Sequence, residues 1–347
     1  MLGVELFSGA GGLSLGAMWS GVNVVLAIEK DVYSAQTYSF NHPKVKLVNK
    51  DIREVNLPRF RKRRKPLILF GGAPCQGFST SNQRTRTSAN PSNWLYKEFL
   101  RFANQLRPDW VVFENVKGIV ETEGGKFLGR ILSQLDDLGY LLSYDVINAN
   151  DFGVPQNRSR LFIVGSRNGE KIELPKPKTM SKVTVHDAIS DLPLLDNGAS
   201  QNFLSYRSRP YSNYARQMRG NLKNCPNHLV TGNAPYIIER YKHIPQGGNW
   251  ENIPPDLMGN YADCTRCHTR IYYRLKDSEP AVVIGNFRKN MLIHPVQNRG
   301  LSVREAARLQ SFPDNYEFKG SIGFQQQQVG NAVPPLLAKA VFDRIPK

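Results

Sequence analysis

Short runs of apolar, often β-branched residues alternate with helix-like segments along the first half of the chain. Most runs are continuous rather than alternating, which is typical of strands buried on both faces of a sheet. The segments between them, such as Leu95–Leu106 and Gly125–Leu138, carry apolar residues at helical spacing. This βαβ alternation predicts an α/β fold with a doubly wound, mostly parallel sheet. The predicted strands are Gly3–Phe7, Val22–Glu29, Val45–Val48, Leu67–Phe70, Trp110–Glu114, Leu142–Ala149 and Leu161–Gly165.

The middle of the chain has a different texture. From about Glu173, Pro, Asn, Arg and Tyr become frequent, and apolar periodicity fades until about Leu301. We therefore predict a second, smaller and irregular domain at residues 176–299, with residues 1–175 and 300–347 forming the first domain. Helical patterns return at Ser302–Leu309 and Pro335–Phe342, and we expect both to pack back on the first domain.

Polar motifs follow the predicted strands, where ligands of doubly wound sheets bind. The first strand runs into FSGAGG, in which Gly9 and Gly11 permit a tight turn and a close approach to a ligand. Glu29 ends the second strand 18 residues after Gly11, and a carboxylate there can accept hydrogen bonds from ribose hydroxyls. Asp51 follows the third strand and could accept from an adenine amino group. These features indicate an adenosine cofactor and leave a nicotinamide cofactor open as an alternative; a glycine turn without a ligand is the third possibility.

Three further motifs carry candidate chemistry. Cys75 lies just past the fourth strand in a polar Gly/Pro-rich turn, PCQG, a place that favours a nucleophile over an ordinary packing cysteine. Glu114 ends the fifth strand, where burial can raise its pKa for acid chemistry, although it could instead cap the next helix. Arg158 and Arg160 share one face of an extended segment, QNRSR, and suit substrate oxygens or phosphates; a solvated rim is the alternative.

Composition narrows the class of partner and compartment. The 347 residues carry a net charge of +17 with a pI near 9.8, which favours a polyanionic partner, nucleic acid above all. Four cysteines are too few for a disulfide scaffold, so we expect a reducing cytoplasm. No apolar run approaches the ~20 residues of a membrane span, and the first residues lack the pattern of a signal peptide.

The order of the motifs ELFSGAGG, PCQGFS, ENV, QNRSR, REAARLQSFP and QVGNAVPP resembles the cytosine-C5 DNA methyltransferases, in particular the prokaryotic restriction–modification or phage type. The resemblance implies the S-adenosylmethionine-dependent methyltransferase fold, with the middle domain as the target-recognition domain. It also implies that the enzyme flips a cytosine out of duplex DNA and methylates its C5, with Cys75 bound covalently to C6. We expect a monomer that acts on DNA, with a cognate restriction endonuclease as a possible partner.

By the same resemblance, site residues can be assigned in three groups. The catalytic residues would be Cys75, Glu114 at cytosine N3, Arg160 at the base and Arg158 in support. The residues at S-adenosylmethionine would be Phe7, Gly9, Gly11, Glu29, Asp51, Ile52, Pro74, Leu95 and Asn331. The residues at DNA would be Gln76, Ser79, Ser81, Arg84 and Arg86, in a basic loop that could close over the duplex.

Three other functions stay open: a catalytically inactive DNA-binding protein on the same fold, a nicotinamide oxidoreductase, and a tRNA methyltransferase. An oxidoreductase leaves PCQ and ENV unexplained, and the tRNA branch carries a Cys-Phe-Thr signature that is absent here.

Two features have an ordinary and a functional interpretation. The basic run Arg59–Lys65 precedes the fourth strand, which places it at the end of the sheet opposite the active site, so a solvated segment is favoured over a remote DNA contact. Cys225 and His228, like Cys264 and Cys267, have zinc-like local spacing. We favour buried thiols and predict no metal.

Overall fold

A computed structural model describes residues 1–56, 65–74, 94–167, 169–177, 181–259, 271–285, 287–288 and 291–346. The chain forms two compact units. Unit 1 comprises residues 1–152, 159–178 and 335–347, and unit 2 comprises residues 153–158 and 179–334.

Unit 1 is built on a seven-stranded sheet with the strand order β3-β2-β1-β4-β5-β7-β6. The first five strands in this order are parallel, and β7 pairs antiparallel with both β5 and β6. The central strands are buried along almost their whole length, as their continuous apolar runs predict. The predicted α/β class and mostly parallel sheet are therefore confirmed. The strands are β1 (Leu2–Leu6), β2 (Asn23–Ile28), β3 (Lys46–Val48), β4 (Leu67–Gly71), β5 (Trp110–Val116), β6 (Leu141–Asn148) and β7 (Ser159–Ser166).

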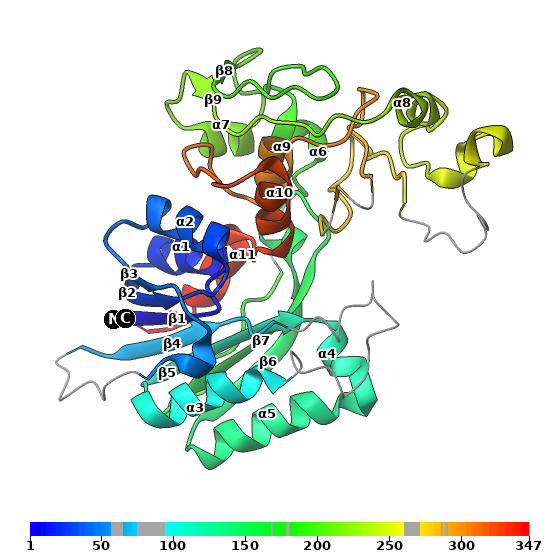
Figure 1. Cartoon of the computed structure of the whole chain (residues 1–347). Coiled ribbons are helices and arrows are strands. Elements are labelled where there is room, and N and C mark those ends of the chain that lie inside the picture. The colour runs from blue at the N-terminus through cyan, green and yellow to red at the C-terminus, as the bar shows by residue number, and fades with distance from the viewer. Residues whose placement is uncertain are drawn as a thin grey trace. The chain divides into compact units, whose positions relative to one another are not determined.

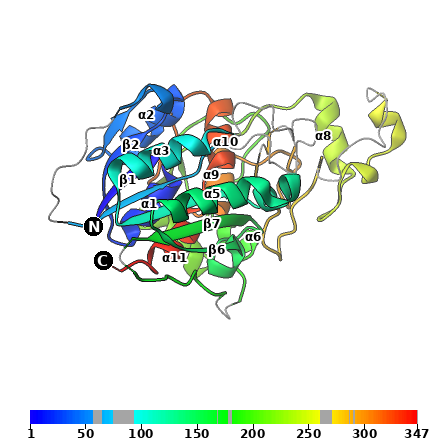
Figure 2. The ribbon, with the colours of Figure 1, turned by 90° about the horizontal axis from the view of Figure 1, so that it is seen from below.

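Helices cover both faces of this sheet. Figure 1 shows α1, α2 and α11 on one face and α3 and α5 on the other, and in the view from below of Figure 2 α3 and α5 lie in front of the strands. In α3, Phe99, Phe102 and Leu106 recur at helical spacing and are buried in the main core. The helices are α1 (Gly12–Trp19), α2 (Val32–Asn41), α3 (Tyr96–Leu106), α4 (Gly118–Glu121), α5 (Lys126–Asp137) and α11 (Pro335–Phe342), with short 3₁₀ turns at Ile52–Glu54, Thr122–Gly125 and Ala149–Phe152.

The C-terminal helix α11 packs against α1, more than 300 residues away in the sequence, as expected for a segment that returns to the first domain. A glycine makes this contact possible. A Cβ at Gly16 of α1 would lie 2.4 Å from the Cβ of Ala338 and 2.5 Å from the carbonyl oxygen of Pro335. The two helices therefore approach more closely than any larger side chain at position 16 would allow.

Unit 2 contains short helices and little sheet, in line with its irregular sequence. A small apolar core gathers Ile237 and Tyr241 of α8 with Ile253, Tyr272 and Ile293. The elements are α6 (Val185–Ile189), β8 (Leu204–Ser205), α7 (Asn213–Arg219), β9 (Asn224–Cys225), α8 (Pro235–Lys242), α9 (Val303–Leu309) and α10 (Ile322–Asn331), with 3₁₀ turns at Trp250–Asn252 and Pro255–Met258.

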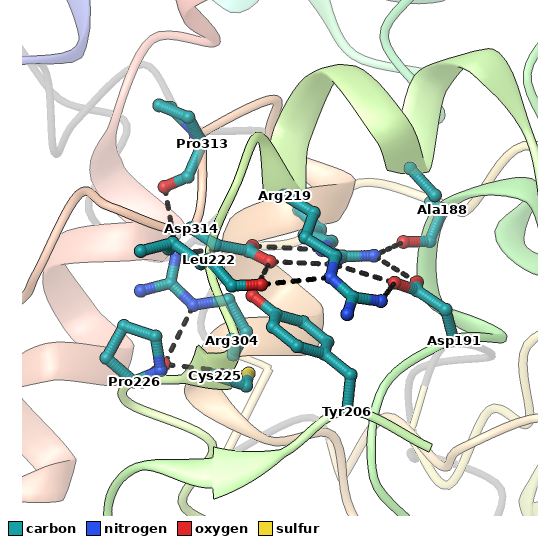
Figure 3. Close-up of polar contacts among 12 residues, drawn as sticks. Ala188, Asp191, Tyr206, Arg219, Leu222, Cys225, Pro226, Arg304, Pro313 and Asp314 are labelled. Atoms are coloured by element: carbon teal, nitrogen blue, oxygen red, sulfur yellow. Dashed lines mark hydrogen bonds and ion pairs between the residues drawn. The ribbon is translucent and has the colours of Figure 1, made fainter. Parts of the chain in front are cut away.

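A buried cluster of charged residues joins several of these elements (Figure 3). Arg308 of α9 binds both oxygens of Asp314, at 2.9 and 2.6 Å, and its Nη1 also pairs with Asp191. The hydroxyl of Tyr206 donates to Asp314 at 2.6 Å. Arg304 of α9 donates to the carbonyl oxygen of Pro226 at 2.9 Å. Because each of these buried charges is paired and hydrogen-bonded, removal of one partner would leave an uncompensated charge in the interior.

The compact units divide the chain at different places from the two functional domains that the sequence predicts. Residues 300–334 belong to unit 2, whereas α11 belongs to unit 1. The expectation that Ser302–Leu309 packs on the first domain is therefore wrong, because α9 packs against α6 and α10 within unit 2. The assignment of 176–299 to target recognition concerns function and stays a prediction. None of the helices in the described part of the chain combines the length and the apolar composition that crossing a membrane requires.

Candidate active site

The carboxyl ends of five neighbouring parallel strands share one edge of the sheet in unit 1. From β3 to β5 this edge carries Asp51, Glu29, the glycine turn after β1, the segment Gly72–Pro74 and Glu114. The strand order reverses between β1 and β4, and such a switch point is where open α/β sheets bind their ligands. The topology therefore brings together the unit 1 motifs that the sequence places after separate strands.

The glycine turn has a tightly constrained backbone. Phe7, Gly9 and Gly11 all have positive φ angles, of 57°, 52° and 87°. Phe7 is strained in this region, whereas glycine adopts it readily. The hydroxyl oxygen of Ser8 is buried in the same turn and has no hydrogen-bond partner among the described residues. A turn of this kind, followed at once by the amino end of α1, leaves polar backbone and hydroxyl groups available to a ligand.

Glu29 fixes the turn from the end of β2. One carboxylate oxygen accepts the N–H of Gly9 at 2.8 Å, and the other accepts the N–H of Asp31 at 2.7 Å. Burial raises the pKa of Glu29, against the lowering effect of these hydrogen bonds. Each oxygen keeps capacity for a further hydrogen bond. The predicted place of Glu29 beside the glycine turn is thus what the structure shows; its role toward ribose stays a prediction.

Asp51 and its neighbours lie at the end of β3. Both oxygens of Asp51 accept from Arg53, at 2.9 and 2.7 Å, and Lys30 lies 3.6 Å away. Hydrogen bonds from Arg53 hold the pKa of Asp51 well below its usual range. Ile52 is buried in the main core, and Leu95 packs against that core from the start of α3. Sequence analysis did not anticipate Arg53 as the partner of Asp51, and the role of Asp51 toward adenine stays a prediction.

A second set of polar residues supports the glycine turn, and sequence analysis missed it. Glu5, in the middle of β1, is buried and accepts a hydrogen bond from the hydroxyl of Ser14 in α1. The oxygen of Ser14 lies 2.7 Å from the hydroxyl of Tyr38 in α2. His42 packs its ring on Tyr38, with centroids 4.6 Å apart, and hydrogen-bonds the backbone of Gly11. The available signal was a glutamate inside an otherwise apolar buried strand.

Glu114 and Arg160 form an ion pair at the end of β5. Arg160 of β7 lies opposite Val116, which makes it a diagonal neighbour of Glu114 on the same face of the sheet. Its Nε is 3.0 Å from Oε1 of Glu114, and both side chains are largely buried. A Cβ at Gly72 would lie 2.4 Å from Oε2 of Glu114. The carboxylate is therefore confined between the guanidinium and a glycine, and it does not cap the following helix α4, whose N-terminus has no side-chain cap.

Asn115 fastens the segment that leads to Cys75. Its buried side-chain amide donates to the carbonyl oxygen of Ala73 at 3.3 Å, and its Oδ1 accepts the N–H of Val116 at 2.9 Å. Pro74 is exposed beyond Ala73 and is the last described residue before the nucleophile predicted from the sequence. The ENV motif thus supplies both a carboxylate and a tie to the neighbouring strand end.

Arg158 and Asn331 belong to unit 2. Arg158 is buried, and its guanidinium donates to the carbonyl oxygens of Ile284 and Gly330 at 2.9 Å and of Ala332 at 3.1 Å. Through these three hydrogen bonds Arg158 holds backbone segments of unit 2 together. Asn331 is the exposed last residue of α10.

The structure describes one of the two residue pairs that have zinc-like spacing, Cys225 and His228. Cys225 is buried, and burial raises the pKa of its thiol to about 12. Both ring nitrogens of His228 are engaged, one 2.8 Å from the hydroxyl of Ser302 and one 2.7 Å from the carbonyl oxygen of Pro193. Within the described part of the chain no three metal-binding side chains cluster. Cys264 and Cys267 lie outside the described residues.

Several predicted residues cannot be placed, because they also lie outside the described ranges. They are Cys75, Gln76, Ser79, Ser81, Arg84, Arg86 and, in the basic run, Arg59–Arg64.

Comparisons with known proteins identify the family. A family model for C-5 cytosine-specific DNA methylases matches residues 1–347. The Type II methyltransferase M1.HphI of Haemophilus parahaemolyticus is 37% identical over 99% of this chain and 86% of its own. The Type II methyltransferase M.DdeI of Desulfomicrobium norvegicum is 32% identical, with coverage of 99% and 88%.

A solved structure shares the fold across the whole chain. It is a prophage-encoded protein of E. coli assigned as a DNA modification methyltransferase, with a TM-score of 0.79 over 99% of this chain and 97% of that one, at 24% identity. This likeness shows a shared fold, and the family match and the relatives above 30% identity identify the family. The chain belongs to the C-5 cytosine-specific DNA methylases and is a DNA (cytosine-5)-methyltransferase.

Proposed function

We propose that this enzyme methylates C5 of a cytosine in a specific duplex DNA sequence, with S-adenosylmethionine as the methyl donor and Cys75 as a covalent nucleophile. The observation that carries this proposal is the arrangement at two neighbouring strand ends. The Glu114–Arg160 ion pair lies near the end of β5. On the neighbouring strand β4, the segment Gly72–Pro74 is hydrogen-bonded to Asn115 and is followed in the sequence by Cys75.

The first three strand ends fit S-adenosylmethionine. Ser8 Oγ is a buried polar atom with no partner in the described structure, and Glu29 retains acceptor capacity for ribose hydroxyls. Asp51 and Ile52 would hold the adenine, with Leu95, Pro74 and Asn331 as further contacts. When bound, the cofactor supplies a methyl group activated by the sulfonium. We favour S-adenosylmethionine over a nicotinamide dinucleotide at these groups, because a nicotinamide-dependent reaction would give the Cys75 and Glu114 motifs no role.

The chain's own residues account for the activation of the base. C5 and C6 of cytosine are stacked in a duplex, so the target must leave the stack, at a cost of a few kcal/mol. The thiolate of Cys75 adds to C6, and Glu114 hydrogen-bonds or protonates N3 so that negative charge does not build up on the ring. C5 thereby becomes nucleophilic and takes the methyl group. Loss of the C5 proton and elimination of the Cys75 sulfur from C6 restore the aromatic ring.

Arg160 positions the acid in this scheme. Its ion pair holds Glu114 at a fixed place, and charge-assisted hydrogen bonds of this kind are strong and directional. We further propose that Arg160 contacts the target base, because it lies beside Glu114 at the edge of the sheet. Arg158 acts at a distance, through the carbonyl groups it binds in unit 2.

The substrate and biological setting follow the relatives, which are named as Type II methyltransferases. We infer a role in a restriction–modification system, a cognate endonuclease acting on the same site, and base recognition by residues 176–299. Gln76, Ser79, Ser81, Arg84 and Arg86 would contact the DNA around the flipped base.

A covalent trap tests the mechanism. A duplex with 5-fluorocytosine at the target should form an adduct that survives denaturation when S-adenosylmethionine is present, because fluorine at C5 cannot leave as a proton does. Cys75→Ser should abolish the adduct while the protein stays folded. An adduct that persists in the serine variant would contradict the assignment of Cys75, and no adduct with a methylating wild-type enzyme would contradict covalent catalysis.

A further inference from the structure

Glu5 is a buried carboxyl that the proposed mechanism does not use. Its side chain lies in the middle of the central strand β1 and is only 1% exposed. Within the described part of the chain, no ion pair links Glu5 to a cation. Carboxyl groups are rarely buried without such a partner, because desolvation disfavours the charged form.

Glu5 belongs to a network that ends at the glycine turn. Ser14 of α1 donates its hydroxyl to Glu5 and lies 2.7 Å from the hydroxyl of Tyr38 in α2. Ser14 is in the first turn of α1, three residues after Gly11. On the other side of the turn, Glu29 holds Gly9 and His42 holds Gly11. The hydrogen bond from Ser14 to Glu5 thus ties the start of α1, which directly follows the glycine turn, to β1.

The pKa of Glu5 is raised to about 8, chiefly by burial and also by the charge of Glu29 just after β2, against the lowering effect of hydrogen bonds from Ser14 and Tyr38. His42, on α2, has its pKa lowered by burial to about 4, so it is neutral in the range where Glu5 titrates. The titratable groups that act on Glu5 are therefore Glu29 and Tyr38, and His42 packs on Tyr38. Ionised Glu5 would place a second negative charge in the same dry region as Glu29.

We propose that Glu5 is a positioning residue that fixes the glycine turn in its uncharged form, and that ionisation of this carboxyl loosens the turn and weakens cofactor binding. This inference rests on the proposed cofactor site. Ionised Glu5 would repel the carboxylate of Glu29 or draw water beneath the turn, and either change would move Gly9 and Gly11 away from the ligand.

Calorimetry of S-adenosylmethionine binding to the full chain between pH 7 and pH 9, compared with Glu5→Gln, tests this proposal. If the ionised form does not bind, the wild-type Kd should rise by about tenfold over this range beyond any rise in the variant. The ligand's own amino group titrates nearby, but it affects both proteins equally. A constant ratio of the two Kd values would overturn the proposal.

Tyr38→Phe provides an independent test that does not require the glutamine variant to fold. The tyrosine hydroxyl stabilises the ionised form of Glu5. Its removal should therefore move the loss of affinity to higher pH, and an unchanged or lower midpoint would contradict the network.

Thermal unfolding gives a second readout on the same proteins. Because the folded chain holds the Glu5 proton more tightly than the unfolded chain, wild-type stability should fall relative to Glu5→Gln as pH rises from about 5 to 8. A stability difference that does not change with pH would indicate a purely structural role. If the wild type does not bind S-adenosylmethionine even at pH 7, the cofactor assignment itself fails, which is a distinct result.

Discussion

At the scale of single residues, the carboxylate of Glu114 is held in place by residues that lie outside its own ENV motif. Arg160 comes from β7, and the space beside Oε2 exists because position 72 is a glycine. Gly72 does not have a positive φ angle. Glycine is therefore required at this position because it lacks a side chain, not because of its backbone freedom. A methyl group at this position must displace the carboxylate or the strand end that carries it.

Gly72→Ala should therefore impair the chemical step and leave cofactor binding nearly intact. A displacement of about 1 Å at a reacting group can cost about 100-fold in rate, so we expect kcat to fall by about that factor. Single-turnover methylation measures the rate, and calorimetry measures the Kd for S-adenosylmethionine. Gly129→Ala is the matched control, because a Cβ there meets no atom within 4 Å. A Gly72→Ala enzyme with normal single-turnover rate would show that Glu114 is not confined as described.

The sequence was sufficient to predict Glu29, Asp51 and Glu114 as strand-end residues, because the strand pattern alone sets which positions reach the binding edge. It was not sufficient for Glu5, Ser14, Tyr38 and His42, which act through contacts between elements. Nor did it show that Asp51 is bound by Arg53, or that the guanidinium of Arg158 is engaged by three backbone carbonyls. Contacts of this kind depend on packing that residue type and spacing do not specify.

At the scale of elements, the seven strands were predicted within about two residues, since long buried apolar runs are the strongest local signal. Helix α1 is harder to recognise, because it begins inside the glycine motif and contains Gly12 and Gly16. Its stability comes from packing on α11 rather than from intrinsic propensity.

Gly16→Ala tests the importance of that packing. Alanine at an unhindered helix position would stabilise the protein by up to ~1 kcal/mol. Here the added methyl group overlaps Ala338 and the carbonyl of Pro335, so we expect a net loss of about 1–3 kcal/mol in the free energy of unfolding. Denaturant unfolding measures it, and Gly129→Ala in α5 should show the opposite sign. A Gly16→Ala protein that is as stable as the wild type would mean that α1 and α11 can separate at little cost.

At the scale of the whole molecule, the net charge of +17 has to be divided between cations that can meet DNA and cations that hold the fold. Residues 197–238 contain no aspartate or glutamate, and the basic character of this stretch predicts phosphate contacts by Arg207, Arg209, Arg216 and Arg219. In the structure Arg219 has partners within the protein. Its guanidinium stacks 3.8 Å from the ring centroid of Tyr206, donates to Ser208 O at 2.7 Å and lies 3.6 Å from Asp191 (Figure 3).

The sequence could not separate Arg219 from its neighbours, because all four arginines occur in the same polar stretch. The difference arises from the buried carboxylates Asp191 and Asp314, which come from distant positions in the chain and draw arginines inward. Arg207, Arg209 and Arg216 are exposed. Of these four arginines, Arg207, Arg209 and Arg216 are therefore the ones whose side chains are open to a polyanion.

A salt series should separate the two kinds of arginine. Each neutralised phosphate contributes about −0.9 to the slope of log K against log salt concentration, so replacing Arg207, Arg209 and Arg216 by Gln should reduce the magnitude of the slope by about two to three units. Arg219→Gln should leave the slope unchanged and instead lower the melting temperature, because it removes a cation from a partly buried network. Fluorescence anisotropy with a labelled duplex measures the slopes, and a thermal scan of each variant measures stability. Equal slopes for the triple variant and the wild type would mean that this acid-free surface does not meet DNA, and a reduced slope for Arg219→Gln alone would return that residue to the DNA interface.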